Sequence, residues 1–412
     1  MDQSELLPHL FRAEYRKIIS VLSARFGIQY LEVAEDIASE TFLQATELWP
    51  VKGQPDHPVA WLYKVAQNKM LNHLKRDKLF SEKVSVAVRP EMQSVEVALD
   101  FSEKSINDSQ LAMVFAVCNP VLSPEAQVAL ALNLLCGFGA KEIATAFLTN
   151  TEVIYKRLNR AKATLRETNI AIETPPDSEI GKRLPYVLST LYLLFSEGYY
   201  SMSQDHLIRQ ELCAEAMRLN YLLVNNPLSN TPEVNALLAL MCFQSSRFEA
   251  RMGENGEQIL YDEQDPNLWN EALIDNGNYF LSRAATGSQL TKYHLEAGIA
   301  SWHAHKTAQD EKWDNILQLY NHLLVVEYSP MAALNRTFAL AKAHGKPQAI
   351  VEAEKLQLTT HPLYFSLLGY LYTDIDDAKA LSHYQKALDL TQADAQRIAL
   401  RKAIAKLEKE VR

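Results

Sequence analysis

Apolar residues recur every three or four positions along most of the chain, the spacing of amphipathic helices, so the sequence predicts an all-α protein. The pattern is clearest over residues 151–166. One face of that predicted helix holds four apolar residues: Ile154, Leu158, Ala161 and Leu165. A shorter helix around Ile143 precedes it across a turn at 148–150, and Thr151 is placed to cap the second helix.

The outer face of this second helix is polar and cationic. Residues 152–166 hold five cations and one anion, a net charge of +4. This is the arrangement of a helix-turn-helix: the first helix supports the second, and the second offers polar groups to the major groove of DNA. The predicted DNA-contacting residues are Thr151, Glu152, Tyr155, Lys156, Arg157, Asn159 and Arg160. An ordinary amphipathic hairpin with a basic outer face is the alternative interpretation.

A second basic segment lies upstream, and its polar residues fall on one face of a predicted helix. They are headed by an aromatic ring: Trp61, Lys64, Asn68, Asn72 and Lys75, with Arg76 beside them. We call this set the Trp61 seam. Apolar residues cover both of its flanks. Cations attract phosphate, amides reach base edges and a ring stacks on bases, so the seam suits a strand of nucleic acid. A solvated basic face is the alternative interpretation.

The segment before the seam is acidic instead. Five carboxylates surround an apolar stripe: Glu32, Glu35, Asp36, Glu40 and Glu47. An anionic face repels DNA, so the sequence predicts a protein partner for this helix. Pro50, Gly53, Pro55 and Pro58 predict a loop between the acidic helix and the seam.

These segments, taken in order, resemble bacterial sigma factors. Residues 9–80 are similar to the region-two domain, and residues 106–168 to the region-four domain. The region-two matches are Ala34-Glu35-Asp36-Ile37, Glu40-Thr41-Phe42 and Trp61-Leu62-Tyr63-Lys64-Val65-Ala66-Gln67-Asn68. The region-four matches are Leu122-Ser123-Pro124-Glu125 and the helix pair from Ile143-Ala144 to Arg160-Ala161. Only about 25 residues separate the two domains, which leaves no room for a folded region between them. In this the chain is similar to the extracytoplasmic-function group of sigma factors.

The resemblance implies binding to core RNA polymerase and promoter-directed initiation of transcription. Core polymerase would contact the acidic helix through Glu35, Asp36, Glu40 and Thr41. The helix-turn-helix would bind the double-stranded upstream promoter element. The Trp61 seam and the loop at 50–60 would bind the melted downstream element. The chain departs from the usual residues of the group at four positions, which leaves the promoter sequence unpredicted: Val33, Gln67, Asn72 and Gly139.

The C-terminal half is also expected to be helical. Residues 363–388 resemble a tetratricopeptide repeat, residues 313–356 show a looser version, and residues 183–300 show helices without a clear period. This half resembles the C-terminal extension of one group of these sigma factors, through stretches such as Leu191–Tyr199 and Asp262–Asp265. That likeness implies regulation by the extension, with a small YCII-like protein as a partner. A helical array without a specific ligand is the alternative interpretation.

The expected domains follow from these patterns. They are a region-two domain at 1–82, a linker at 83–105, a region-four domain at 106–170, a linker at 171–182 and a helical regulatory domain at 183–412. The net charge of −9 divides into −1 for the first 170 residues and −8 for the rest. Local basic patches, rather than net charge, should therefore decide contact with DNA.

The same sequence argues against other functions. It has no Walker loop, no dinucleotide-binding glycine motif and no nucleophile elbow, so we expect neither an enzyme nor a cofactor. His303 and His305 would point to different helix faces, so we expect no metal site. Four isolated cysteines and the absence of a signal-peptide pattern or an 18-residue apolar run predict a cytoplasmic protein that does not enter membranes. The alternative function is a helix-turn-helix regulator or helical scaffold that does not bind polymerase.

Overall fold

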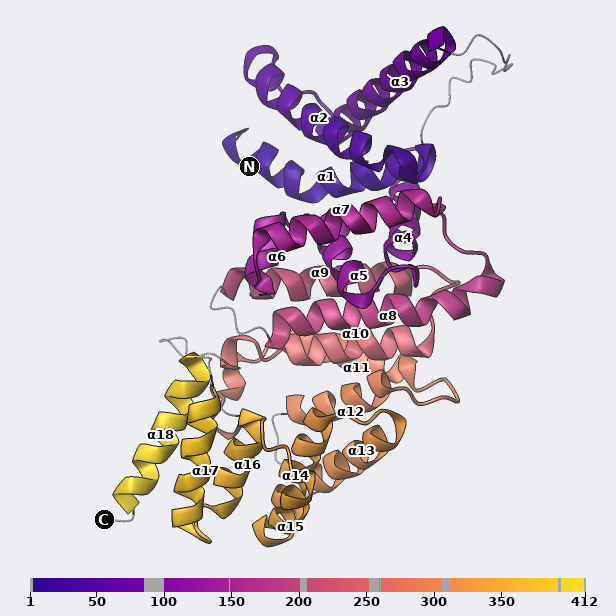
Figure 1. Cartoon of the computed structure of the whole chain (residues 1–412). Coiled ribbons are helices and arrows are strands. Elements are labelled where there is room, and N and C mark those ends of the chain that lie inside the picture. The colour runs from indigo at the N-terminus through magenta and orange to yellow at the C-terminus, as the bar shows by residue number, and fades with distance from the viewer. Residues whose placement is uncertain are drawn as a thin grey trace. The chain divides into compact units, whose positions relative to one another are not determined.

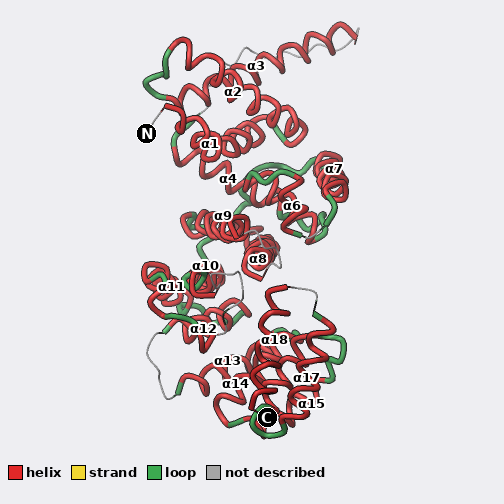
Figure 2. The backbone as a smooth tube through the Cα atoms, turned by 90° about the vertical axis from the view of Figure 1, so that its left-hand side faces the viewer, coloured by secondary structure: helices red, strands yellow, loops and turns green. Residues whose placement is uncertain are grey.

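The computed structural model describes most of the chain. The described residues are 3–84, 100–147, 149–200, 206–251, 259, 261–305, 311–391 and 394–410. Within these ranges every regular element is a helix, which confirms the all-α prediction (Figure 2). The chain divides into two compact units, residues 1–229 and 230–412. Most of the expected linker at 83–105 lies outside the described residues.

Three long helices form the first part of the first unit (Figure 1). They are α1 (Gln3–Phe26), α2 (Leu31–Lys52) and α3 (Pro58–Val84), with the short helix η1 (Ile28–Tyr30) between the first two. Their shared core contains fully buried Ile18, Leu31 and Leu62. Helix α2 continues through Pro50, so the loop before α3 is shorter than the prolines predicted. Pro50 has no N–H to donate to the carbonyl four residues earlier, so α2 forgoes one hydrogen bond there, and the helix continues for only two more residues.

The next helices of the first unit lead up to α7, which packs against α5 and α6. They are α4 (Glu103–Val117), α5 (Pro124–Leu130), the π-helical turn η2 (Ala131–Cys136), α6 (Ala140–Ala146) and α7 (Thr151–Glu167). The Ser123 hydroxyl caps α5, and the Glu142 carboxylate accepts a 2.6 Å hydrogen bond from the Gly139 N–H at the start of α6. Thr151 was predicted to cap α7, but the cap is Asn150, whose side chain accepts from the Glu152 N–H at 2.8 Å. An asparagine one residue earlier caps the helix as well as threonine would.

Helices α8 (Asp177–Tyr200) and α9 (His206–Asn225) belong to the first unit and pack against α4 and α5. Three hydrogen bonds join the two layers. Arg183 donates to the Phe115 carbonyl at 2.6 Å, and the Thr190 hydroxyl donates to the Gln127 amide oxygen at 2.8 Å. Arg218 donates to the carbonyl oxygen of Leu135 at 3.0 Å. Residues 183–229 therefore support the helices that carry α7.

The second unit is a succession of helices in which neighbours along the chain pack on one another. The α-helices are α10 (Pro232–Ser245), α11 (Glu271–Ala284), α12 (Lys292–Ala304), α13 (Lys312–Val326), α14 (Pro330–His344), α15 (Lys346–Leu356), α16 (Pro362–Tyr372), α17 (Asp377–Leu390) and α18 (Asp394–Glu410). Short turns η3 (Glu249–Arg251), η4 (Tyr261–Glu263) and η5 (Pro266–Leu268) lie between α10 and α11. A continuous apolar core runs from α12 to α18.

One glycine in this array makes a close helix crossing possible. A Cβ atom on Gly369 of α16 would lie 2.7 Å from ring carbons of Tyr384 on α17. We expect Gly369→Ala to destabilise the second unit by about 1–3 kcal/mol, because the ring must move within a packed core. Urea denaturation measures the change. Gly181→Ala is the control, since a Cβ at this exposed helical site meets nothing within 4 Å; we expect it to stabilise the protein by roughly 0.4–1 kcal/mol. Equal effects of the two variants would contradict the packing argument.

The cysteines and the helix lengths add two further facts. All four cysteines are free, and Cys118, Cys213 and Cys242 are buried. Burial raises the pKa of the Cys118 and Cys242 thiols to about 12, which keeps them protonated and unreactive. Among the described helices, none combines the length and the apolar character that crossing a membrane requires.

Candidate nucleic-acid and polymerase interfaces

Helix α7 has the two faces that its sequence predicted. Ile154, Leu158, Ala161 and Leu165 are all buried, which confirms the apolar stripe. Helix α6 packs against α7 across the turn that precedes it. The apolar stripe fixes the orientation of α7, and its opposite face remains on the surface.

The exposed face of α7 carries most of the predicted DNA-contacting residues. Five of them are exposed: Glu152, Tyr155, Lys156, Asn159 and Arg160. Thr151 and Arg157 are half-buried. Lys156 pairs with Glu152 at 3.0 Å on the open helix surface, where such a pair contributes little and is easily exchanged for a phosphate contact. Tyr155, with 57% of its surface exposed, offers a ring and a hydroxyl group at the same face.

The Trp61 seam lies along α3 as predicted. Lys64, Asn68, Asn72, Lys75 and Arg76 are exposed, and Trp61 is half-buried. The flanking residues Leu62, Tyr63, Ala66 and Met70 are buried, so both sides of the seam are anchored in the core. Tyr63 also donates a 2.9 Å hydrogen bond to Glu14. The anchoring holds the polar groups on one face at helical spacing.

An aromatic pair closes one end of the seam. The ring of Trp61 lies edge-on to that of Trp49 on α2, with centroids 5.5 Å apart. The loop at residues 53–57 joins the two helices at this end. A tryptophan held by a second tryptophan has less freedom to lose when another ring stacks on it, so the seam begins with a positioned stacking surface.

The acidic face of α2 is only partly available to a partner. Asp36 and Glu40 are exposed, and Glu40 pairs with Lys69 of α3 at 3.0 Å. Thr41, predicted to contact polymerase, is fully buried, and its hydroxyl donates to the Ile37 carbonyl at 2.7 Å. Thr41 therefore satisfies its own polar group inside the helix bundle and does not belong to a surface for a partner.

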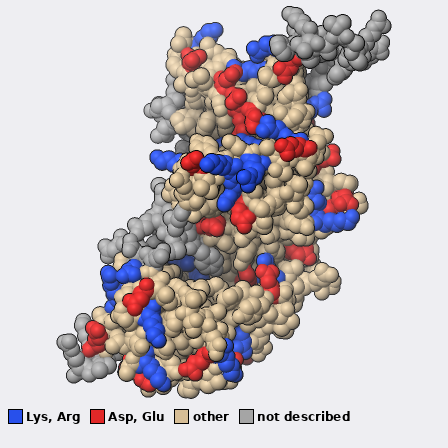
Figure 3. Space-filling view, in the orientation of Figure 1, with Lys and Arg blue, Asp and Glu red and all other residues tan. Residues whose placement is uncertain are grey.

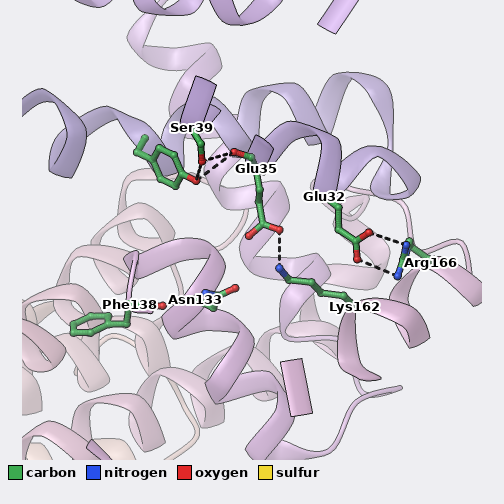
Figure 4. A network of polar contacts seen from close by, with 8 residues as sticks. Glu32, Glu35, Ser39, Asn133, Phe138, Lys162 and Arg166 are labelled. Atoms are coloured by element: carbon green, nitrogen blue, oxygen red, sulfur yellow. Dashed lines mark hydrogen bonds and ion pairs between the residues drawn. The ribbon is translucent and has the colours of Figure 1, made fainter. Parts of the chain in front are cut away.

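Two ion pairs connect the acidic helix α2 to α7 (Figure 4). Lys162 Nζ lies 2.6 Å from Glu35 Oε2, and these side chains are only 12% and 20% exposed. Arg166 contacts both carboxylate oxygens of Glu32, at 3.1 and 3.2 Å. The sequence did not predict these contacts. We call them the α2–α7 ion pairs.

The charge distribution agrees with these contacts. Cationic side chains gather over α7, and acidic side chains gather next to them over α2 (Figure 3). The Glu35 backbone is also held, because its carbonyl accepts a 3.3 Å hydrogen bond from Tyr15, whose hydroxyl lies 2.8 Å from Ser39 Oγ. In the free chain, the end of the acidic face at Glu32 and Glu35 is therefore neutralised by α7.

An apolar cavity of about 630 Å³ lies between α1 and the second half of α2, the helix that also carries the acidic face. It is lined by residues of α1, α2 and the loop that follows, including Phe11, Phe42, Trp49 and Pro50. Phe11 is 45% exposed and Leu43 on α2 is 59% exposed. Exposed aromatic and aliphatic surface of this kind is typical of the core of a protein-binding region.

The acidic residues of the stretch Asp262–Asp265 make structural contacts. Asp262 pairs with Lys342 at 2.8 Å, and Asp265 caps η5 by accepting from the Asn267 N–H at 2.9 Å. Within the described ranges, no group of three or more His, Cys, Asp or Glu side chains is arranged to hold a metal ion.

Comparisons with known proteins assign these features to families. Residues 10–79 match sigma-70 region 2, and residues 183–285 match a family of unknown function, DUF6596. The chain is 31% identical over 371 residues to an uncharacterized protein of Rhizobium meliloti (strain 1021), covering 87% of this chain and 86% of that protein. No solved structure matches. The chain therefore belongs to one family with the Rhizobium protein, and the match of its residues 10–79 to sigma-70 region 2 supports membership of the sigma-70 family.

Proposed function

We propose that the chain is a sigma factor that directs core RNA polymerase to specific promoters and initiates transcription. The observation that carries this proposal is the sigma-70 region 2 match, which covers both the acidic face of α2 and the Trp61 seam of α3. A DNA-binding regulator that acts without polymerase needs no such acidic face beside a basic seam. This second candidate therefore leaves α2 unexplained.

The acidic face would bind core polymerase through Asp36 and Glu40, with Glu35 added once its pair with Lys162 opens. Carboxylates at the rim give specificity and speed of association. The neighbouring cavity lined by Phe11 and Phe42 gives the contact an apolar part that charge alone would not supply.

The Trp61 seam would bind the melted downstream element. Extruding a base from the duplex costs a few kcal/mol, and stacking on an aromatic ring returns about 1–3 kcal/mol per base. Trp61 offers the ring, Lys64 and Lys75 attract phosphates, and Asn68 and Asn72 offer amides to base edges. These residues lie on one exposed face, so a single strand can follow them in order.

Helices α6 and α7 would form the helix-turn-helix that reads the upstream element. Lys156, Arg157 and Arg160 would lie near phosphates, and Glu152, Tyr155 and Asn159 nearer bases. Only 18 residues lie between the end of α3 at Val84 and the start of α4 at Glu103. That length supports the extracytoplasmic-function group, whose members need no folded region between these two domains.

The two roles within α7 predict different mutant behaviour. Lys156→Ala and Arg160→Ala should weaken binding to all sequences and reduce the slope of log affinity against log salt by about one unit per lost phosphate contact. Asn159→Ala should change sequence preference instead, at about 1–3 kcal/mol per base contact. Fluorescence anisotropy on a set of promoter duplexes over a salt series measures both effects. Uniform losses for all three variants would show that α7 does not read bases.

The C-terminal part would act as a regulatory element with two roles. Helices α8 and α9 support α4, α5 and η2 through Arg183, Thr190 and Arg218, so residues 183–229 stabilise the DNA-reading part. The tetratricopeptide-like second unit would control activity, either alone or through a small partner protein. Its acidic balance makes it a poor ligand for DNA and a suitable one for proteins.

Reconstituted transcription tests the proposal. Full-length chain with core polymerase should give transcripts from its own promoter, and core polymerase alone should give none. A chain truncated after Ser229 keeps the first compact unit, so we expect it to bind promoter DNA normally while its transcript yield changes severalfold, with a fall more expected than a rise. Absence of transcripts with full-length chain at every promoter selected from a genomic library would contradict the sigma assignment. Unchanged yield after truncation, in cells as well as in vitro, would contradict only the regulatory role.

A further inference from the structure

A cluster of cations and aromatic rings surrounds Tyr261 in the second unit. Lys312 Nζ lies 4.9 Å and the Arg247 guanidinium carbon 5.2 Å from the Tyr261 ring centroid. The rings of His303 and Trp269 lie 4.8 and 6.5 Å from it. Arg247 follows the end of α10, Tyr261 begins η4 and Trp269 follows η5. His303 lies in the last turn of α12, and Lys312 begins α13. We call these five residues the Tyr261 cluster.

Tyr261 fixes the position of Lys312. The tyrosine hydroxyl donates to the carbonyl oxygen of His303 at 3.1 Å, so its oxygen is left to accept from Lys312 Nζ, at 2.5 Å. An ammonium group has three N–H donors and no acceptor, so this bond leaves donors of Lys312 for another partner. Lys312 is itself buried.

Several other polar nitrogens in the cluster lack a hydrogen-bond partner. Arg247 Nε and Nη1, Trp269 Nε1 and His303 Nδ1 are all buried without a hydrogen bond. Arginine and tryptophan nitrogens can only donate. A buried donor without an acceptor costs about 1–3 kcal/mol, and more when it is charged, so native proteins rarely keep several in one place. An acceptor-rich ligand would satisfy them.

The charges of the cluster point in the same direction. Among the described residues, no carboxylate forms an ion pair with Arg247 or Lys312. Asp262, whose charge acts on Lys312, is bonded to Lys342 at 2.8 Å. Burial and the Arg247 charge lower the pKa of Lys312 to about 8, against the opposing effect of Asp262. Burial, Arg247 and Lys312 together also hold the pKa of His303 well below its usual value.

We infer that the Tyr261 cluster binds a small oxyanion, a phosphate or carboxylate group of a small molecule. Two cations and the donor N–H groups around one ring supply charge and hydrogen bonds for such a group, and they repel metal ions. The half-buried rings of Tyr261 and Trp313 would contact the remainder of the ligand. The second unit would then sense a metabolite, a role separate from contact with DNA or polymerase.

Isothermal titration calorimetry of the full-length chain tests this inference. The probes are sodium sulfate, inorganic phosphate and acetate, each against sodium chloride of equal ionic strength. We expect Arg247→Leu to weaken binding of the best probe by about tenfold or more, the size of a lost charged hydrogen bond. Lys379→Gln is the matched control, because Lys379 also lies over a ring, Tyr372, but is exposed and paired with Asp376. Preference for phosphate over acetate, or the reverse, identifies the group that the site takes.

The pH dependence is a second readout that does not depend on Arg247→Leu folding. Sulfate and acetate keep a constant charge from about pH 6.5 to about pH 9.5, so a change in affinity reports on the protein. The charged groups that act on Lys312 are Arg247 and Asp262, and Asp262 is itself paired with Lys342. Tyr261 and His303 are uncharged over this range, because burial raises the pKa of Tyr261 and lowers that of His303. Lys312 loses its proton above about pH 8, so affinity should fall as pH rises through that value. Lys312→Arg should retain affinity at the high end, because arginine stays charged, and Lys312→Met should bind weakly throughout.

The inference and the sigma assignment can fail separately. If none of the three anions binds, or if Arg247→Leu and Lys312→Met bind them as wild type does, the oxyanion site is wrong while transcription is untouched. A tenfold loss in these variants with normal promoter binding supports the site whatever the second unit does to transcription.

Discussion

Asp36→Arg with Glu40→Arg should abolish binding to core RNA polymerase while promoter DNA is still bound. Both carboxylates are exposed on α2, and reversing two charges at an electrostatic interface replaces attraction by repulsion, at several kcal/mol in total. We expect affinity for core polymerase to fall by at least about a hundredfold, since 1.4 kcal/mol corresponds to tenfold. Surface plasmon resonance with immobilised core polymerase measures the loss, and anisotropy on an upstream-element duplex measures retained DNA binding.

A matched variant separates the position of the charges from their number. Asp108→Arg with Glu173→Arg makes the same change at two other exposed sites of the first unit. We expect normal polymerase binding from this control. The charge reversal at Glu40 also breaks its ion pair with Lys69, but this should hardly change the stability of the protein, because exposed pairs contribute about 0–1 kcal/mol. If the variant Asp36→Arg with Glu40→Arg bound core polymerase as tightly as the wild type, α2 would not be part of the docking surface.

The parts of the molecule that repeat with helical spacing could be predicted from the sequence. The buried stripe of α7 and the exposed Trp61 seam with its buried flanks both follow from residues three or four apart, which share a helix face whatever the tertiary structure. The loop predicted to begin at Pro50 was wrong, because a proline is compatible with some turns of a helix and not with others. That distinction depends on where α2 ends, which no local pattern of residues fixed.

Thr41 shows why residue type is a weak guide to exposure. It lies in a string that resembles the polymerase-binding helix, yet its position faces the core. A threonine can be buried because its hydroxyl bonds to the carbonyl four residues earlier. The packing of α8 and α9 against α4 and α5 also lay beyond the sequence, since Arg183–Phe115 and Thr190–Gln127 join residues more than 60 positions apart.

The α2–α7 ion pairs are the long-range feature with the clearest functional consequence. Lys162 and Glu35 are 127 positions apart, so charge patterning within either helix could not pair them. Under the proposed function, Glu35 belongs to the polymerase face and α7 reads DNA. Both partners of each pair would then have to separate before the chain engages polymerase and promoter together. The free chain would therefore be held in a closed state, by which we mean the state in which the α2–α7 ion pairs are formed.

Chemical cross-linking can detect this closed state directly. A carbodiimide joins a carboxylate to an amine without a spacer, so Glu35 and Lys162 should couple in the free chain and be found by mass spectrometry. The Glu40–Lys69 pair, within the region-two part, is an internal standard. We expect binding of core polymerase to remove the Glu35–Lys162 product. Persistence of that product in the polymerase complex would contradict the closed-state interpretation.

Lys162→Ala with Arg166→Ala should tighten binding to core polymerase by about five- to thirty-fold. The two α2–α7 ion pairs together contribute roughly 1–2 kcal/mol to the closed state, since one is largely buried and the other is a two-bond arginine contact. If core polymerase binds only the open state, its apparent affinity is reduced by the closed-to-open equilibrium, and removing the ion pairs restores that affinity. Neither residue is among the predicted DNA-contacting residues, so affinity for the upstream duplex should change little. Lys104→Ala with Lys182→Ala removes two exposed cations elsewhere in the first unit and should have no effect. Equal polymerase affinity for wild type and for Lys162→Ala with Arg166→Ala would show that the ion pairs do not restrain the free chain.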